Sequence, residues 1–234
     1  MKKNLWKESF LIKESKCTVI SDCQRGIKIA VDSMKRNRQE LEKYIRSNSN
    51  FLYSLKPVVV PEKPLVAEMM AEAALKAGVG PMAAVAGAMA DLAVADMTAA
   101  GCKVAVVEDG GEIAAQSNRS VDVALSAGDE PLSKKFGFRL EEFPVGVATS
   151  SGRFSHALSF GDAEAVTVFC KNATLADAAA TAVGNIIKGG NVHAAIKAGI
   201  KRGLSIEGVE GMLIMYKGQI GTAGKIPQII KIEP

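Results

Sequence analysis

Two turns that contain glycine carry the residue types best suited to holding an anionic ligand. They are Asp109-Gly110-Gly111 and Thr149-Ser150-Ser151-Gly152-Arg153. Glycine adopts positive φ and leaves backbone N–H groups open to an anionic oxygen, while hydroxyl and guanidinium groups bind phosphate or carboxylate. The same residues also form ordinary hairpin turns and loops. Their order along the chain favours one ligand pocket that both turns line.

A pair of oxygen-bearing side chains is a candidate magnesium site. Asp177 and Thr181 are four residues apart in an Ala-rich segment, so on a helix their oxygens point to the same side. Mg²⁺ prefers hard oxygen ligands and fills its shell with water and phosphate. An acidic residue near a helix N-terminus also stabilises the helix dipole, with Thr174 as a candidate N-cap, so a structural role stays open.

His156 and Cys23 are the candidates for proton transfer and for thiol chemistry. His156 follows the second turn and could act there as an acid or base, whereas His193 fits a surface or capping role near the start of a helix. The four cysteines include no Cys-x-x-Cys pair, which argues against a zinc site or a disulfide framework. Cys23, beside an arginine in a predicted turn, is the best candidate for a reactive thiolate, while Cys102 and Cys170 fit buried strands.

The segment before the first turn is rich in alanine. Gly87 lies inside residues 82–100, which we predict to be a helix capped at its C-terminal end by Gly101. Small residues let another backbone or a flat ligand approach closely. Gly87 is therefore a candidate ligand contact, and tight helix packing is an equally supported alternative.

The remaining pattern predicts the elements that hold these residues. Helical spacing and small-residue runs predict helices at residues 27–46, 65–76, 82–100, 175–187 and 192–202. Short apolar or alternating runs predict strands at residues 10–22, 103–107, 113–115, 120–125, 145–149, 165–170, 212–216, 217–220 and 229–232. Strands and helices come in runs and do not alternate strictly. The predicted fold class is α+β, with mixed or antiparallel sheet layers packed by Ala-rich helices.

Length and composition favour one globular domain. The 234 residues approach the upper limit for one hydrophobic core, so residues 1–234 form one predicted domain, with a strand–helix subregion at 1–56 and a proline-rich connector at 56–64. No uncharged apolar stretch of about 18–20 residues is present, so we expect no membrane partner and a cytoplasmic location. The N-terminal segment is basic, which suits nucleic acid, but a solvated helix face explains it better.

Four segments, taken in order, resemble motifs of the ApbE-like superfamily, best known for flavin transferases that move FMN from FAD onto a protein serine or threonine with Mg²⁺. They are Ala86-Gly87-Ala88-Met89-Ala90, Val106-Val107-Glu108-Asp109-Gly110-Gly111-Glu112-Ile113, Val147-Ala148-Thr149-Ser150-Ser151-Gly152 and Leu175-Ala176-Asp177-Ala178-Ala179-Ala180-Thr181-Ala182. The resemblance covers residues 83–184. It implies a single ApbE-like α+β domain, FAD or FMN as candidate cofactors, and Mg²⁺ held by Asp177 and Thr181.

The chain departs from these transferases after Gly152. The transferases carry a His-x-x-Asp-Pro-x-x-Gly segment that helps to build the active site, whereas residues 155–161 here contain no Asp-Pro pair. The chain looks more like a short, functionally uncharacterised branch of anaerobic archaea and bacteria. Because fold transfers more readily than activity, flavin transfer need not persist in that branch.

Three functions therefore compete. The first is binding of a small anionic or nucleotide-type ligand with Mg²⁺, and with His156 as the nearby proton carrier if a reaction occurs. The second is a persulfide-carrying role of Cys23 in sulfur assimilation toward homocysteine, with which the short branch is associated. The third is a structural or partner-binding domain whose glycines and alanines only pack. A homodimer would suit a surface of small residues.

Overall fold

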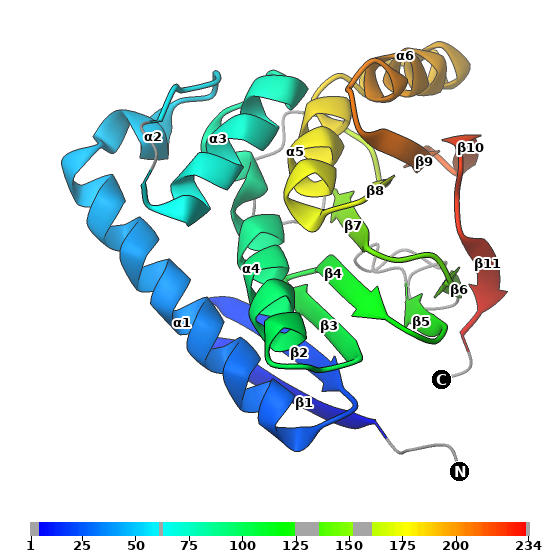
Figure 1. Cartoon of the computed structure of the whole chain (residues 1–234). Helices are drawn as coiled ribbons and strands as arrows, with labels where there is room; N and C mark the ends of the chain where they lie inside the picture. Colours follow the sequence, from blue (N-terminus) through cyan, green and yellow to red (C-terminus); the bar gives the residue numbers. More distant parts are fainter. Residues whose placement is uncertain (1–4, 61–62, 125–135, 152–160, 233–234) are drawn as a thin grey trace.

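The chain folds around one large antiparallel sheet. A computed structural model describes residues 5–60, 63–124, 136–151 and 161–232. Eight strands form the large sheet in the order β1-β2-β3-β4-β7-β8-β9-β10, and three more form a small sheet in the order β11-β6-β5 (Figure 1). The strands are β1 (Trp6–Ile12), β2 (Ser15–Ser21), β3 (Val104–Asp109), β4 (Glu112–Ser117), β5 (Val121–Ala124), β6 (Phe136–Leu140), β7 (Val145–Ser150), β8 (Ala165–Cys170), β9 (Val209–Tyr216), β10 (Gln219–Gly224) and β11 (Gln228–Lys231).

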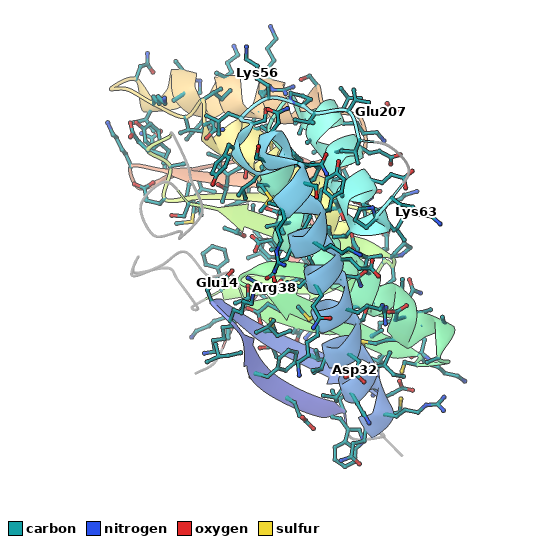
Figure 2. The ribbon with its side chains drawn as sticks, turned by 90° about the vertical axis from the view of Figure 1, so that its left-hand side faces the viewer. Glu14, Asp32, Arg38, Lys56, Lys63 and Glu207 are labelled. Atoms are coloured by element: carbon teal, nitrogen blue, oxygen red, sulfur yellow. The ribbon has the colours of Figure 1, made fainter. Side chains whose placement is uncertain are left out.

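Helices cover one face of the large sheet. They are α1 (Gln24–Ser47), α2 (Ser49–Tyr53), α3 (Leu65–Ala77), a short 3₁₀ turn η1 (Pro81–Ala84), α4 (Val85–Ala99), α5 (Ala173–Gly184) and α6 (Val192–Leu204). Helix α4 packs against β3 and β4, and α5 packs against β7 and β8. Helix α1 lies along the outer side of α4 and crosses the β1–β2 hairpin (Figures 1 and 2).

The small sheet covers the opposite face, so the central strands are buried on both sides. Along β3, Ala105 and Val107 pack into the core beneath the helices, whereas Val104 and Val106 pack into a second core beneath the small sheet. Successive side chains of a strand point to opposite faces. The continuous apolar run at residues 103–107 is the expected sequence of a strand covered on both faces.

The predicted α+β class is confirmed, and several details differ from the expectations. Arg25 and Gly26 belong to the first turn of α1 and do not form a turn after β2. Strands β3 and β4 extend as far as Asp109 and Glu112, which leaves a turn of two residues. Strand β6 was not predicted, because Gly137 and Arg139 interrupt its short apolar pattern.

One segment, Pro81–Ala99, is long and apolar enough to cross a membrane by length and composition alone. It comprises η1 and α4. Helix α4 packs against α1, α5, β3 and β4. These contacts place it as the central helix of a globular core, and its apolar composition follows from that burial.

Candidate functional site

The first predicted turn and the described residues of the second, 149–151, lie at the same end of the large sheet. Gly110 (φ +69°) and Gly111 (φ +123°) close the β3–β4 hairpin in the left-handed region that two-residue hairpin turns require. Strand β4 pairs with β7 through Ile113 and Val147. Continuing that antiparallel register brings the end of β7, Thr149 and Ser150, beside the Gly110-Gly111 turn. The hairpin role of the glycines is thus confirmed, and their role toward a ligand stays a prediction.

The end of β7 contributes hydroxyl groups to this region. Thr149 and Thr167, on neighbouring strands, have their Oγ1 atoms 3.0 Å apart, within hydrogen-bonding distance. Ser151 follows the strand and is buried. Gly152, Arg153 and His156 lie outside the described residues. The described part of the second turn is therefore a row of hydroxyls at the strand end.

Helices α4 and α5 cross with their N-terminal ends in contact. The Oδ2 atom of Asp177 accepts a hydrogen bond of 3.0 Å from the Gly87 backbone N–H in the first turn of α4. In return, Asp91 on α4 accepts bonds from the backbone N–H groups of Ala173 and Thr174, at 2.9 and 2.8 Å, and from the Thr174 hydroxyl. Each carboxyl group thus supplies hydrogen-bond acceptors to the N-terminal end of the other helix.

Gly87 makes that crossing possible. A Cβ atom at this position would lie 2.2 Å from the carbonyl oxygen of Ala173. The close backbone approach expected at Gly87 is therefore the approach of α5, which is the packing alternative. The signal that reveals this contact in the sequence is the pair of aspartates four residues into each Ala-rich segment, Asp91 after Gly87 and Asp177 after Ala173.

Three carboxyl groups gather around the glycine turn. Burial raises the pKa of Asp109, Glu112 and Asp177. The negative charges of Asp177 and Asp109 raise the pKa of Glu112 further, and the Asp109 charge acts on Asp177 in the same way. The pKa of Asp177 reaches about 7, although the Gly87 N–H lowers it. The structure thus brings the candidate metal ligand Asp177 next to the first predicted turn.

Thr181 lies one helical turn beyond Asp177, and both side chains are half-buried on α5. Their oxygens belong to the hard donors that Mg²⁺ takes. Neighbouring carboxylates oppose the ionisation of Asp177. A cation bound there would favour its ionised form. The residue types therefore fit a magnesium ion in their chemistry.

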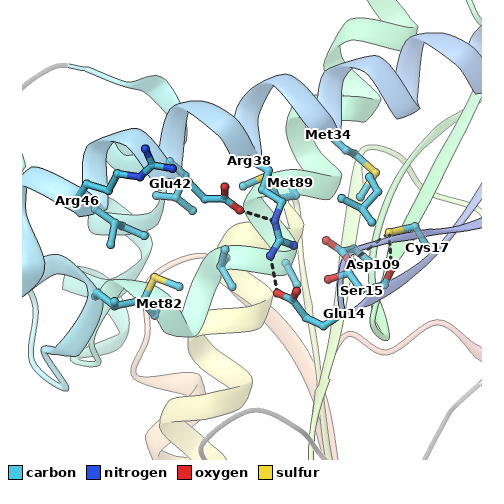
Figure 3. A pocket seen from close by; sticks show the side chains of 16 residues that line it. Glu14, Ser15, Cys17, Met34, Arg38, Glu42, Arg46, Met82, Met89 and Asp109 are labelled. Atoms are coloured by element: carbon cyan, nitrogen blue, oxygen red, sulfur yellow. Dashed lines mark hydrogen bonds and ion pairs between the residues drawn. The ribbon is translucent and has the colours of Figure 1, made fainter.

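A cavity of about 450 Å³ extends from Asp109 between α1, the β1–β2 hairpin and the start of α4 (Figure 3). Met34, Leu41 and Met89 form apolar walls, and Arg46 lines the cavity as well. Its volume falls within the range of about 300–1,000 Å³ that is typical of small-ligand pockets. Of the predicted ligand contacts, Asp109 lines this cavity.

Arg38 is the most constrained charge in the cavity. Its Nη2 atom donates to Glu14 at 2.5 Å and its Nε donates to Glu42 at 2.9 Å, so the guanidinium bridges β1–β2 and α1 (Figures 2 and 3). The sequence pattern predicts that these charges form a solvated helix face. The missed signal is that Arg38 follows Met34 by four residues, which places it on the apolar face of α1.

Cys17 lies beside Asp109 at the inner end of the cavity. Its Sγ atom is 3.5 Å from Asp109 Oδ1, and it is fully buried. Burial and the adjacent Asp109 charge raise the pKa of the Cys17 thiol. At neutral pH this group is a protonated hydrogen-bond donor, and it is not a nucleophile.

The predicted reactive cysteine has a partner that the sequence did not indicate. Cys23, the N-cap of α1, is in contact with Cys102, and Asp22 lies beside both. Within the described residues, these three side chains form the group of acidic, thiol or imidazole ligands close enough to share one ion. Cys102 is buried, as expected. The sequence distance of 79 residues hid the pairing.

The sheet, the crossed Ala-rich helices and the glycine turn define a class of fold seen in solved structures. An ApbE protein of Thermotoga maritima superposes with a TM-score of 0.62 at 13% identity, over 93% of this chain and 96% of that one. The apo flavinyl transferase ApbE of Pseudomonas stutzeri gives a TM-score of 0.53 at 14% identity, over 94% of each chain. At these identities the likeness establishes the ApbE fold alone.

Sequence comparison supplies the family. The family model described as AbpE bacteria matches residues 12–218. A UPF0280 protein of Methanococcus maripaludis is 39% identical over 233 residues, which are 97% of this chain and 94% of the relative. A UPF0280 protein of Methanocaldococcus jannaschii is 37% identical over 235 residues, 98% of this chain and 95% of the relative. The chain belongs to this ApbE-like family, and the predicted family resemblance is confirmed.

Proposed function

We propose that the protein binds a flavin or another nucleotide-type ligand that carries phosphate, with Mg²⁺ at Asp177 and Thr181. One observation carries the proposal. The cavity of about 450 Å³ ends at Asp109, whose negative charge adds to burial in raising the pKa of Glu112 and of Asp177. Asp177 and Thr181 do not line the cavity themselves, so the ion would lie beyond its Asp109 end. An apolar pocket with a carboxyl group at one end suits a ligand that brings a ring system and, with a cation, phosphate.

The walls of the cavity support a flat ring. Met34, Met82 and Met89 line it from α1, η1 and α4. Methionine side chains are flexible and polarisable, and they make favourable contacts with aromatic rings. Arg46 adds a guanidinium group that could donate hydrogen bonds to ring carbonyls, sugar hydroxyls or phosphate. Arg38 adds a second, whose Nε and Nη2 are already bound to Glu42 and Glu14.

The acidic end of the cavity requires a cation before it accepts phosphate. Asp109, Glu112 and Asp177 repel one another and would repel a phosphate group equally. A bound Mg²⁺ supplies the positive charge that lets these carboxyls ionise and holds phosphate oxygens beside them. Asp177 and Thr181 would hold the ion near the Gly110-Gly111 turn, in which the Gly110 N–H already donates to the carbonyl oxygen of Lys16.

The solved relatives support flavin as the ligand class. The structures with the same fold are described as ApbE flavin transferases. Binding is the part of that activity for which this chain offers a cavity and a candidate metal site. Transfer of a flavin group is not part of the proposal, because the chain lacks the Asp-Pro segment of the transferases.

Titration calorimetry with FAD, FMN and ATP, each with and without Mg²⁺, tests the proposal. We expect binding that Mg²⁺ strengthens and that Asp177→Ala reduces only when Mg²⁺ is present. Asp32→Ala is the matched control, because Asp32 is an exposed aspartate on α1 away from the cavity (Figure 2). Absence of binding to all three nucleotides by the folded protein would rule the proposal out.

A sulfur-carrying role of Cys23 is a second candidate, which the half-buried position and lowered pKa of Cys23 favour. A persulfide on Cys23 would lie within reach of the Cys102 thiol. Mass spectrometry after polysulfide treatment should then show an added sulfur that Cys23→Ser abolishes. If wild type and Cys102→Ser both remain unmodified, this candidate is excluded.

A further inference from the structure

Two cysteines from distant parts of the chain meet where α1 begins and α4 ends. The Sγ atoms of Cys23 and Cys102 are 3.1 Å apart, and both thiols are free. Cys23 precedes the first residue of the 24-residue helix α1, and Cys102 follows the last turn of α4. We propose that these two residues are a reversible dithiol–disulfide pair that links α1 to α4.

The surroundings of the two thiols divide their roles. Cys23 is half-buried and Cys102 is buried, so an external reagent reaches Cys23 first. Gly26 forms the covering wall: a Cβ there would lie 2.4 Å from Ser21 Oγ and 2.9 Å from Cys102 Sγ. The α1 backbone thus closes directly over Cys102. This arrangement fits an attacking thiol at Cys23 and a resolving thiol at Cys102.

The local charges assign the same roles to the two thiols. Burial opposes ionisation of Cys23, but hydrogen bonds from the Cys102 thiol, the Ser21 hydroxyl and the Gly26 N–H lower its pKa below the ordinary value. Burial and the neighbouring Cys23 raise the pKa of Cys102. A thiolate at a helix N-terminus is also stabilised by the helix dipole. Cys23 is therefore the member of the pair that carries the thiolate.

The reaction needs a small-molecule disulfide as oxidant. The Cys23 thiolate attacks one sulfur of the disulfide, which forms a mixed disulfide and releases one thiolate of the reagent. Cys102, after losing its proton to solvent, attacks the Cys23 sulfur, which forms the Cys23–Cys102 bond and releases the second thiolate. The protein loses two electrons and two protons, and the oxidant is reduced to two thiols.

The acidic neighbour of the pair already has a structural role. The Oδ1 atom of Asp22 accepts the backbone N–H groups of Lys103 and Val104, at 3.0 and 3.1 Å. These bonds fix the segment that carries Cys102 against the end of β2. Asp22 thereby holds the two cysteines in register, and a thiophilic cation bound by all three groups is the competing outcome that the experiment must detect.

A Cys23–Cys102 disulfide would join the two helices that wall the cavity. The later half of α1 and the start of α4 line the cavity, whereas Cys23 and Cys102 sit at the opposite ends of these helices. A disulfide between them constrains the unfolded chain across a long loop. We expect the oxidised protein to melt roughly 5–15 °C above the reduced protein.

The experiment equilibrates reduced, metal-free full-length protein in glutathione buffers of graded redox potential, followed by alkylation and peptide mass spectrometry. We expect loss of two hydrogens and a cross-linked peptide joining Cys23 to Cys102, reversed by excess reduced glutathione. Cys102→Ser should accumulate glutathione on Cys23, and Cys23→Ser should leave Cys102 unmodified. Cys170→Ala is the control. Cys170 is buried in β8, so its substitution should leave the cross-link unchanged.

Three results would overturn the inference. The first is wild-type protein in which both thiols stay open to alkylation in excess oxidised glutathione. The second is a glutathione adduct on Cys23 that Cys102 never resolves. The third is tightly bound zinc in the protein as purified, lost in Cys23→Ser and in Cys102→Ser, with no cross-link after the metal is removed. The peptide map of wild-type protein shows whether the cross-link forms, so the test does not depend on the folding of a variant.

Discussion

Asp177 on α5 accepts the backbone N–H of Gly87 on α4, across a crossing at which the two helices are too close for any side chain. Asp91 makes the reciprocal contact to the start of α5. The same carboxyl group that holds the helices together is therefore the group that faces Glu112 and the glycine turn. The candidate metal ligand is positioned by the core itself, so its structural role and its proposed role as a metal ligand belong to one side chain.

Gly87→Ala should destabilise the fold strongly. The added methyl group would lie 2.2 Å from a backbone oxygen, which no rotamer change relieves. We expect the free energy of unfolding to fall by about 3 kcal/mol, at the upper end of the usual cost of overpacking. Urea denaturation measures this change in the free energy of unfolding. Gly190→Ala is the control, because nothing lies within 4 Å of a Cβ there, and an equal loss in both variants would contradict the packing argument.

Asp91→Asn should weaken the same crossing from the other side. The carboxylate accepts three hydrogen bonds from the start of α5, and in either orientation the amide group would present its NH2 toward at least one of those donors. The expected loss is about 2 kcal/mol in denaturant unfolding. Asp96→Asn, on the same helix but paired with Arg36 at the surface, should cost less than about 1 kcal/mol. Similar losses for the two aspartates would argue against a capping role of Asp91.

The sequence predicted the layers better than it predicted the contacts. Small-residue helices, apolar strands and the Gly110-Gly111 turn follow from local spacing, and the structure contains them. The cavity depends on where α1 crosses the β1–β2 hairpin, which no local pattern specifies. Arg38 looked like one charge of a solvated face because Glu42, four residues further along α1, is an ordinary helix-surface partner, whereas Glu14 is reached only across that crossing.

The cysteine pair was missed for a related reason. Spacing along the chain predicts metal or disulfide sites only when the ligands are close in sequence. Cys23 and Cys102 meet because the end of β2, which Cys23 follows, pairs with the start of β3, which Cys102 precedes. That pairing is a long-range property of the sheet, so the individual cysteines gave no sign of it.

The raised pKa of Asp177 predicts how stability changes with pH. Below its ordinary pKa of 3.8 the group is protonated in both states. Between 3.8 and about 7 the folded protein keeps the proton while the unfolded chain loses it, so the stability decreases as the pH rises through this window and levels off above it. Asp177→Asn removes this contribution.

In buffer with a metal chelator, Asp177→Asn should therefore have a higher Tm relative to wild type at pH 8 than at pH 4. Loss of the negative charge also lets Glu112 ionise more readily, which adds to the effect in the same direction. Asp32→Asn, an exposed site, should show the same Tm difference from wild type at both pH values. A Tm difference for Asp177→Asn that is independent of pH would show that the group is ionised in the folded protein.

Arg46→Ala tests which end of the cavity the ligand occupies. Arg46 lies in the last turn of α1, lines the cavity and forms no ion pair with any residue in the described ranges. If a nucleotide fills the cavity from the magnesium site to this end, its affinity should fall roughly three- to tenfold, the usual worth of one exposed charge-assisted contact. Lys43→Ala removes an exposed charge from the same helix end outside the cavity and should leave affinity unchanged. Equal affinity in wild type and both variants, with binding still dependent on Asp177, would confine the ligand to the acidic end of the cavity.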